Sequence, residues 1–131
     1  MSTSNGPLSD VRVIEMGHVI AAPMCGALLS DFGADVIKIE RPGQGDMLRV
    51  LSTRAKDGVG AWWKTLARNK RLVALDWKTD DGRAVLRRLV ENAQVLIENF
   101  RPGVLVTSQL ILYDLPEWNP DLIIGGISSW G

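Results

Sequence analysis

Three basic side chains stand just after segments that the sequence predicts to be strands. These are Arg41, Lys78 and Arg101, and the aromatic ring of Phe100 is next to the last of them in the chain. Guanidinium and ammonium groups suit phosphate oxygens, Arg as a bidentate fork and Lys as a point charge. The turn Gly17–Ala21 adds backbone N–H donors. Together these groups predict a site for a phosphorylated, partly apolar ligand such as a nucleotide cofactor.

The hydrophobic pattern that must position these residues alternates between strands and helices. The predicted strands are Val11–Glu15, Asp35–Glu40, Arg71–Asp76, Gln94–Glu98 and Asp121–Ile127. The predicted helices are Ala21–Phe32, Ala61–Ala67 and Thr79–Val90, with a loop-rich stretch at Arg41–Gly60 and a further helix and turn within Leu105–Trp118. This alternation predicts an α/β fold with a mostly parallel sheet. The loops that follow the strands of such a sheet gather along one edge, where ligands bind.

Local signals mark the ends of two of these helices. Pro23 suits the start of the first helix, because its missing N–H would be unpaired there anyway. Gly33 is expected to end that helix. Thr79 is expected to cap the later one, where Asp80 and Asp81 face the positive end of the helix dipole. Both helices therefore have defined limits in the sequence.

A plainer interpretation needs no ligand, because loops often carry Lys and Arg that are simply solvated. On composition alone this interpretation is favoured. The turn Gly17–Ala21 lacks the G-x-G-x-x-G pattern of dinucleotide-binding proteins, and the chain has no Walker A motif. A dinucleotide-dependent dehydrogenase and a P-loop NTPase are therefore poor interpretations.

The composition limits the remaining classes of protein. The chain has 131 residues, 46% of them hydrophobic, which fits about one globular domain. Its net charge of +0 provides no overall basic field for nucleic acid. The single cysteine, Cys25, excludes an intrachain disulfide and, with a single His, disfavours a structural zinc site. The uncharged stretch Val19–Leu29 is too short to cross a bilayer, and the N-terminus shows no signal-peptide pattern, so the expected setting is cytoplasmic without a membrane partner.

Six ordered blocks of the sequence resemble CoA-transferase family III, the CaiB/BaiF type, which includes formyl-CoA transferase and alpha-methylacyl-CoA racemase. The blocks are Gly17–Cys25, Asp31–Asp46, Asn69–Arg71, Leu75–Thr79, Glu98–Gly103 and Trp118–Ile123. The resemblance covers nearly the whole chain, from about Leu8 to Gly131. It implies a Rossmann-like α/β segment with flanking helices, the N-terminal part of a larger family fold. It also implies coenzyme A as the bound cofactor, and no metal.

Carried over residue by residue, the resemblance implies a set of contacts to coenzyme A. These are His18, Val19, Ala21, Arg41, Leu75, Lys78, Asn99, Phe100 and Arg101. For His18 the alternative is a buried histidine that closes the turn through hydrogen bonds, and both roles could hold. Cys25 sits in a predicted helix without a nearby base, so we expect a core residue and not a nucleophile.

Two positions depart from the family pattern. After Gly103 the family usually continues with a Leu-Asp/Glu-Arg-Leu-Gly-Leu-like segment, whose Arg can reach a phosphate of coenzyme A. Here Thr107 stands near that Arg position, so this phosphate contact has no matching residue. Gln94 stands where Asp is usual, which we expect to matter less.

The resemblance implies a transferase that moves CoA between an acyl-CoA and a carboxylic acid by means of an aspartate nucleophile. In the family that aspartate lies downstream of the segment that matches Ser128–Gly131. Residues 1–131 are therefore expected to be a truncated N-terminal CoA-binding segment, inactive alone. Two alternatives stay open: an acyl-CoA racemase, which uses an acid/base pair, and a non-catalytic CoA-binding or interaction module. Full-length members form interlocked homodimers. The oligomeric state of this chain and the identity of the acyl donor and the acceptor acid stay open.

Overall fold

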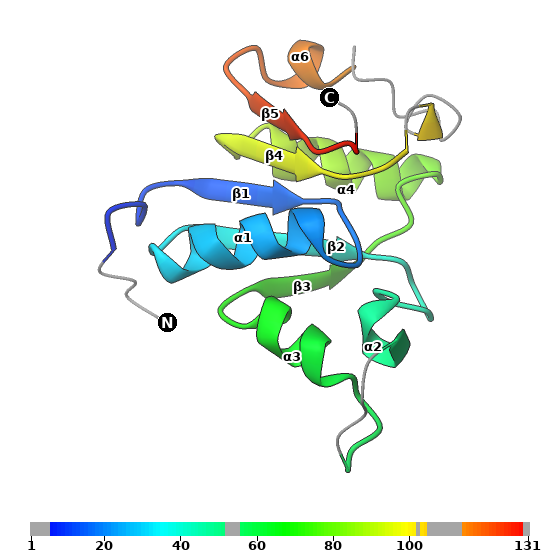
Figure 1. The fold of residues 1–131 in the computed structure, drawn as a ribbon. Coiled ribbons are helices and arrows are strands. Elements are labelled where there is room, and N and C mark those ends of the chain that lie inside the picture. The colour runs from blue at the N-terminus through cyan, green and yellow to red at the C-terminus, as the bar shows by residue number, and fades with distance from the viewer. Residues whose placement is uncertain (1–5, 52–55, 102, 105–113, 130–131) are drawn as a thin grey trace.

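A computed structural model of the chain describes residues 6–51, 56–101, 103–104 and 114–129. Within these residues the centre of the fold is a five-stranded sheet, and every neighbouring pair of strands is parallel. The strands are β1 (Arg12–Glu15), β2 (Asp35–Glu40), β3 (Arg71–Ala74), β4 (Val95–Glu98) and β5 (Ile123–Gly126). Their order across the sheet is β3-β2-β1-β4-β5 (Figure 1). The predicted α/β fold is therefore confirmed.

Helices cover both faces of this sheet. On one face α1 (Ala21–Asp31) lies beside α3 (Ala61–Ala67), which in turn contacts α2 (Leu48–Leu51). On the other face α4 (Asp80–Val90) contacts α6 (Asp114–Trp118) (Figure 1). No helix among the described residues is long and apolar enough to span a membrane.

The pleat of β2 shows how the sheet divides the interior. Ile37 and Ile39 join the larger apolar cluster, which includes residues of α4 and α6. Val36 joins a smaller cluster on the side of α1. Because side chains alternate along a strand, the buried residues Lys38 and Glu40 share the side of Val36. One side of β2 is therefore apolar, and the other side carries buried charge near the end of the strand.

The predicted helix ends are confirmed. Gly33 follows α1 with a φ angle of +100°, a left-handed conformation that glycine adopts at little cost. Thr79 precedes α4, and its side-chain oxygen accepts a hydrogen bond of 3.1 Å from the backbone N–H of Gly82. Pro23 lies in the first turn of α1, where its missing N–H costs nothing.

The structure differs from the prediction in the stretch Arg41–Gly60, which contains the short helix α2. Leu48 begins this helix and is buried against the helices α1 and α3. This apolar contact stabilises a helical turn that is too short to show hydrophobic periodicity in the sequence. Of the helix predicted within Leu105–Trp118, the structure confirms Asp114–Trp118. The rest of that stretch, Thr107 included, lies outside the described residues.

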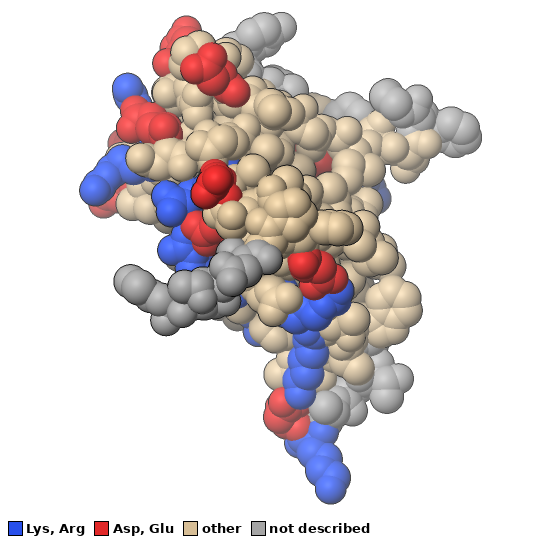
Figure 2. All heavy atoms as spheres, turned by 90° about the vertical axis from the view of Figure 1, so that its left-hand side faces the viewer, with Lys and Arg blue, Asp and Glu red and all other residues tan. Residues whose placement is uncertain are grey.

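The outward side of α1 carries an apolar stripe. Ile20, Met24, Leu28 and Phe32 follow one another at intervals of four residues, and each is between 45% and 56% exposed. This spacing keeps them on one side of the helix. Figure 2 shows the charged side chains gathered mainly on one flank of the molecule, with the opposite flank largely uncharged. Exposed apolar stripes of this kind promote association.

We expect this chain to self-associate through α1. Leu28→Glu should lower the average mass measured by light scattering across a concentration series, because it places a charge in the middle of the stripe. Val85→Glu is the matched control, since Val85 is 43% exposed on the charged helix α4. An equal effect of the two substitutions would show that the stripe does not drive association.

Candidate functional site

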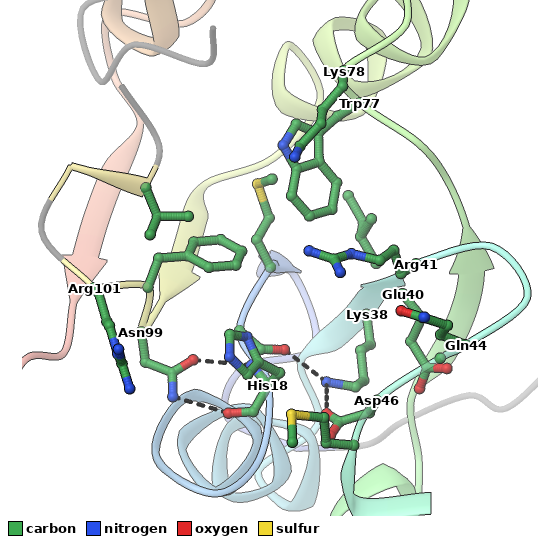
Figure 3. Close-up of a pocket in the computed structure, with 17 residues that line it drawn as sticks. His18, Lys38, Glu40, Arg41, Gln44, Asp46, Trp77, Lys78, Asn99 and Arg101 are labelled. Carbon is green, nitrogen blue, oxygen red and sulfur yellow. Dashed lines mark hydrogen bonds and ion pairs between the residues drawn. The ribbon is translucent and has the colours of Figure 1, made fainter. Parts of the chain in front are cut away.

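A cavity of about 490 Å³ opens at the edge of the sheet where the strands end (Figure 3). Small-molecule sites typically have volumes of this order. Its wall comes from segments that follow four strands, namely Gly17–His18 after β1, Arg41–Met47 after β2, Trp77–Lys78 after β3 and Asn99–Arg101 after β4. The strand order therefore brings together the loops that the sequence predicts to form a site.

Three basic residues on this wall have no acidic partner among the described residues. They are Arg41, Lys78 and Arg101. Of the other described Lys and Arg side chains, all but Lys56 and Arg88 form an ion pair, and these two do not line the cavity. Figure 3 shows Arg41 and Lys78 on one side of the opening and Arg101 across from them, beside Asn99. The cavity thus has uncompensated positive charge at its rim.

An aromatic group forms another part of the wall. The ring of Phe100 lies between His18 and Trp77, with centroid separations of 5.5 Å and 5.9 Å. Met16 and Ile39 add apolar surface behind these rings. The histidine side chain is exposed, so the alternative in which His18 is a buried histidine is wrong. A flat ring or an apolar chain of a ligand can lie against this surface.

The loop after β1 is held by side chains from β2 and from the loops that follow β2 and β4. Asn99 accepts a hydrogen bond of 2.9 Å from the backbone N–H of His18 and donates one of 2.9 Å to its carbonyl oxygen. The Nζ of Lys38 donates to the carbonyl oxygen of Gly17 at 2.9 Å. Asp46 accepts from the backbone N–H of Val19 at 3.1 Å. Three side chains therefore hold three consecutive residues of this loop, and Figure 3 shows the contacts that Asn99 and Lys38 make.

Behind the loop lies a buried charge cluster of Glu15, Lys38, Asp46 and Lys70. Glu15 Oε1 lies 2.8 Å from the Nζ of Lys38, and its Oε2 lies 2.6 Å from the Nζ of Lys70. The Nζ of Lys38 also lies 2.9 Å from Oδ2 of Asp46. All four side chains are at most 2% exposed. Buried charges persist only when they are paired in this way.

This environment shifts three pKa values. Burial alone would raise the pKa of Asp46, but the backbone N–H of Leu48 and the charge of Lys38 outweigh it and hold that pKa below its ordinary value. Burial lowers the pKa of Lys70, against the opposing attraction of Glu15. Burial, assisted by the charge of Glu15, raises the pKa of the Cys25 thiol. A thiol of raised pKa is a poor nucleophile, and Cys25 packs against the apolar cluster under α1 as predicted.

A second arrangement holds the segment after β2. Glu40 accepts a hydrogen bond of 3.0 Å from the indole N–H of Trp63 and one of 2.9 Å from Nε of Arg49. The guanidinium of Arg49 in turn lies 3.7 Å from the centroid of the Trp63 ring, a cation–π contact. Glu40 is therefore engaged by Arg49 and Trp63, and the next residue, Arg41, has no acidic partner in the part of the chain that the structure describes.

The family model for CoA-transferase family III matches residues 8–131. The chain belongs to this family. It is 46% identical over 125 residues to a succinyl-CoA–D-citramalate CoA-transferase of Chloroflexus aurantiacus, covering 95% of this chain and 31% of that protein. It is 39% identical over 124 residues to a formyl-CoA:oxalate CoA-transferase of Afipia carboxidovorans, covering 95% and 29%. The chain thus spans about a third of the length of these relatives.

A solved structure of the same kind gives the same architecture. A CaiB/BaiF family protein from Brucella suis superposes with a TM-score of 0.83 at 38% identity, over 93% of this chain and 33% of the other. The resemblance to CoA-transferase family III inferred from the sequence motifs is therefore confirmed, as is the assignment of this chain to the N-terminal segment of such proteins.

The structure places the family residues carried over by motif in two groups. Those on the cavity wall are His18, Arg41, Lys78, Asn99, Phe100 and Arg101. Val19, Ala21 and Leu75 are not among the residues that line the cavity. Val19 directly follows His18, and the backbone N–H of Leu75 donates to the carbonyl oxygen of Glu40 at 3.0 Å. All of these contacts remain predictions. The structure also gives Asn99 a role within the fold, because its side-chain amide forms two hydrogen bonds with the backbone of His18.

Sequence reasoning missed Lys38, Asp46 and Trp77, which also line the cavity. For Lys38 a signal was present, because a lysine within an otherwise apolar strand must either reach solvent or find a buried partner. Asp46 and Trp77 lie beyond strand ends, where no periodic pattern assigns them a side. Their placement depends on how the loops fold back over the sheet.

The buried charge cluster predicts that position 26 accepts no residue larger than glycine. A Cβ there would lie 2.0 Å from Oε2 of Glu15 and 3.1 Å from the Nζ of Lys70. Gly26→Ala should therefore break the cluster and lower the free energy of unfolding by about 3 kcal/mol or more. Gly125→Ala is the control, because its Cβ would meet Ile97 at an ordinary 3.4 Å. Urea denaturation measures both, and similar losses would argue against the cluster's importance.

The lowered pKa of Asp46 predicts an acid-sensitive contribution to stability. A carboxyl whose pKa is lower when folded stabilises the protein above its unfolded pKa of about 4, and this is lost as the pH falls through the folded value. The difference in unfolding free energy between wild type and Asp46→Asn should be constant above about pH 5 and shrink below about pH 4. A difference that grows on acidification would contradict the assigned direction.

Proposed function

We propose that this chain is the coenzyme A-binding part of a CoA-transferase that moves CoA between an acyl-CoA and a carboxylic acid. The observation that carries the proposal is a cavity with an aromatic, apolar wall and, at its rim, three cations that have no acidic partner among the described residues. Coenzyme A matches this cavity, because it has phosphate groups that cations can bind and less polar groups that can lie against an apolar wall. The relatives named above are CoA-transferases, which favours transfer over racemisation.

The residues present fit this ligand. Arg41, Lys78 and Arg101 would hold the phosphates through charged hydrogen bonds. Phe100 would lie against the adenine or the pantetheine arm. The indole N–H of Trp77 is buried and has no acceptor among the described residues, although such a group ordinarily finds one. A carbonyl or ring nitrogen of the ligand would satisfy it.

The acids on the wall support a binding role over a reacting role. Transfer through a covalent intermediate needs a free carboxylate as nucleophile. Glu40 is engaged by Arg49 and Trp63, and Asp46 is engaged by Lys38 and two backbone N–H groups. We therefore propose that the described residues bind and orient CoA and that the reacting carboxylate lies outside them.

For the whole protein we propose a cytoplasmic homodimer. The exposed apolar stripe on α1 supports contact with further protein. Cys25 is a free thiol, as the cysteines of cytoplasmic proteins ordinarily are.

Calorimetric titration with coenzyme A tests the rim cations. Arg41→Ala or Lys78→Ala should weaken binding about tenfold to a hundredfold, because a hydrogen bond to a charged group contributes roughly 1.5–3 kcal/mol. Thermal melting should change little, since neither side chain forms an ion pair with another described residue. A parallel titration with dephospho-CoA identifies the cation that contacts the 3′-phosphate, because its variant loses the discrimination between the two ligands.

Arg88→Ala is the matched control for these variants. Arg88 is exposed, lacks an acidic partner among the described residues and lies on α4, away from the cavity wall. Its substitution should leave the affinity for coenzyme A unchanged. Equal affinity of wild type and both rim variants would remove Arg41 and Lys78 from the site, and no binding by wild type would overturn the proposed function.

A further inference from the structure

Val19 adopts a backbone conformation that its side chain disfavours. Its φ angle is +65°, in the left-handed region that suits glycine and opposes β-branched residues. Such a conformation persists only where surrounding contacts impose it, and it is often found at functional sites. Val19 follows His18, whose ring lies over the cavity against Phe100. The strain is therefore at the turn that aims the histidine.

Asp46 makes the contact that can impose this conformation. Its Oδ1 accepts hydrogen bonds from the backbone N–H of Val19 at 3.1 Å and from that of Leu48 at 2.9 Å. Its Oδ2 lies 2.9 Å from the Nζ of Lys38. The carboxylate is buried, with 1% of its side chain exposed. One acid thus joins the loop after β1, the start of α2 and the end of β2.

The other groups around the loop cannot replace Asp46. Asn99 binds the N–H and the carbonyl of His18, and Lys38 binds the carbonyl of Gly17. These contacts hold the residues before Val19 and leave its own N–H to Asp46. Val19 also packs against the apolar cluster that includes Leu48. Without the carboxylate, the N–H of Val19 would lose its acceptor in a partly buried position.

We infer that Asp46 is a positioning residue, which holds Val19 in the left-handed conformation and thereby places His18 over the cavity. The consequence for coenzyme A rests on the proposed function, whereas the effect on the loop does not. Asp46 is not a contact of the ligand in this inference. It acts through the backbone of Val19, and its pairing with Lys38 fixes the orientation of its two oxygens.

The test combines Asp46→Ala with Val19→Gly in the full chain. Asp46→Ala should weaken the binding of coenzyme A about tenfold, because the strained turn loses its support. Glycine adopts a positive φ without strain, so adding Val19→Gly to Asp46→Ala should recover affinity at least about threefold. A loss of affinity that came only from a weakened fold would not be recovered, since the glycine also removes apolar packing.

Amide hydrogen exchange supplies a readout that needs no ligand. In Asp46→Ala the amide of Val19 should exchange at least about tenfold faster relative to the core amide of Ile37 than in wild type. Asp46→Asn keeps an oxygen acceptor but lacks the charge, and a hydrogen bond to a neutral acceptor is weaker, so the amide of Val19 should exchange about threefold faster than in wild type, a smaller change than in Asp46→Ala, whereas Asp35→Asn should leave it unchanged. Asp46→Asn keeps the test usable where Asp46→Ala does not fold.

Two results would overturn the inference. One is an exchange rate of the Val19 amide, relative to that of Ile37, that is the same in Asp46→Ala as in wild type. Where Asp46→Ala does not fold, the corresponding result is an equal loss of protection at Val19 in Asp46→Asn and in Asp35→Asn, whose acid lies at the opposite ends of the strands. The other is an affinity for coenzyme A that is the same with and without Val19→Gly in the Asp46→Ala background. If wild type does not bind coenzyme A but Val19 responds in exchange, the proposed function fails and the positioning role stands.

Discussion

The ion pairs among Glu15, Lys38, Asp46 and Lys70 are the constraint on which the geometry of the cavity edge depends. Each side chain is at most 2% exposed, and the distances between charged atoms run from 2.6 to 2.9 Å. A charge buried without its partner costs several kcal/mol, so the members must be buried together. They come from β1, β2, the loop after β2 and the segment before β3. These segments are therefore buried against one another, and the same contacts define the cavity edge.

The cluster also explains why positive charge is available at the rim. Its two carboxylates and two ammonium groups balance, and its outer hydrogen bonds reach the carbonyl oxygens of Gly17 and Pro23, which lie on either side of the turn between β1 and α1. The interior thus fixes the loop without adding net charge to the cavity. The unpaired Arg41, Lys78 and Arg101 then set the local field, and an anionic ligand meets charge that no acid of the described fold neutralises.

Local signals were enough to predict the strands and the rim, because each rim cation lies in the loop that follows a strand and the strand order brings these loops together. The sequence could not predict the partners of Asp46 and Lys70. Asp46 lies beyond β2, and it meets Lys38 only because the intervening turn folds back over the sheet. Lys70 meets Glu15 across 55 positions of the chain. Pairings of this range depend on tertiary packing, which neither alternation nor helical periodicity records.

The pleat of β2 shows what the buried charges contribute. Ile37 and Ile39 face the apolar layer under α4, whereas Lys38 and Glu40 face the side of α1, where ion pairs and hydrogen bonds hold the loops. Apolar contact is not directional, but hydrogen bonds hold their partners at defined distances and angles. Well-packed apolar residues in place of a buried ion-pair network often preserve stability or raise it. Such a replacement would keep the layers together and release the strained turn at Val19. The charges on this side are therefore better explained by the geometry of the site than by the stability of the fold.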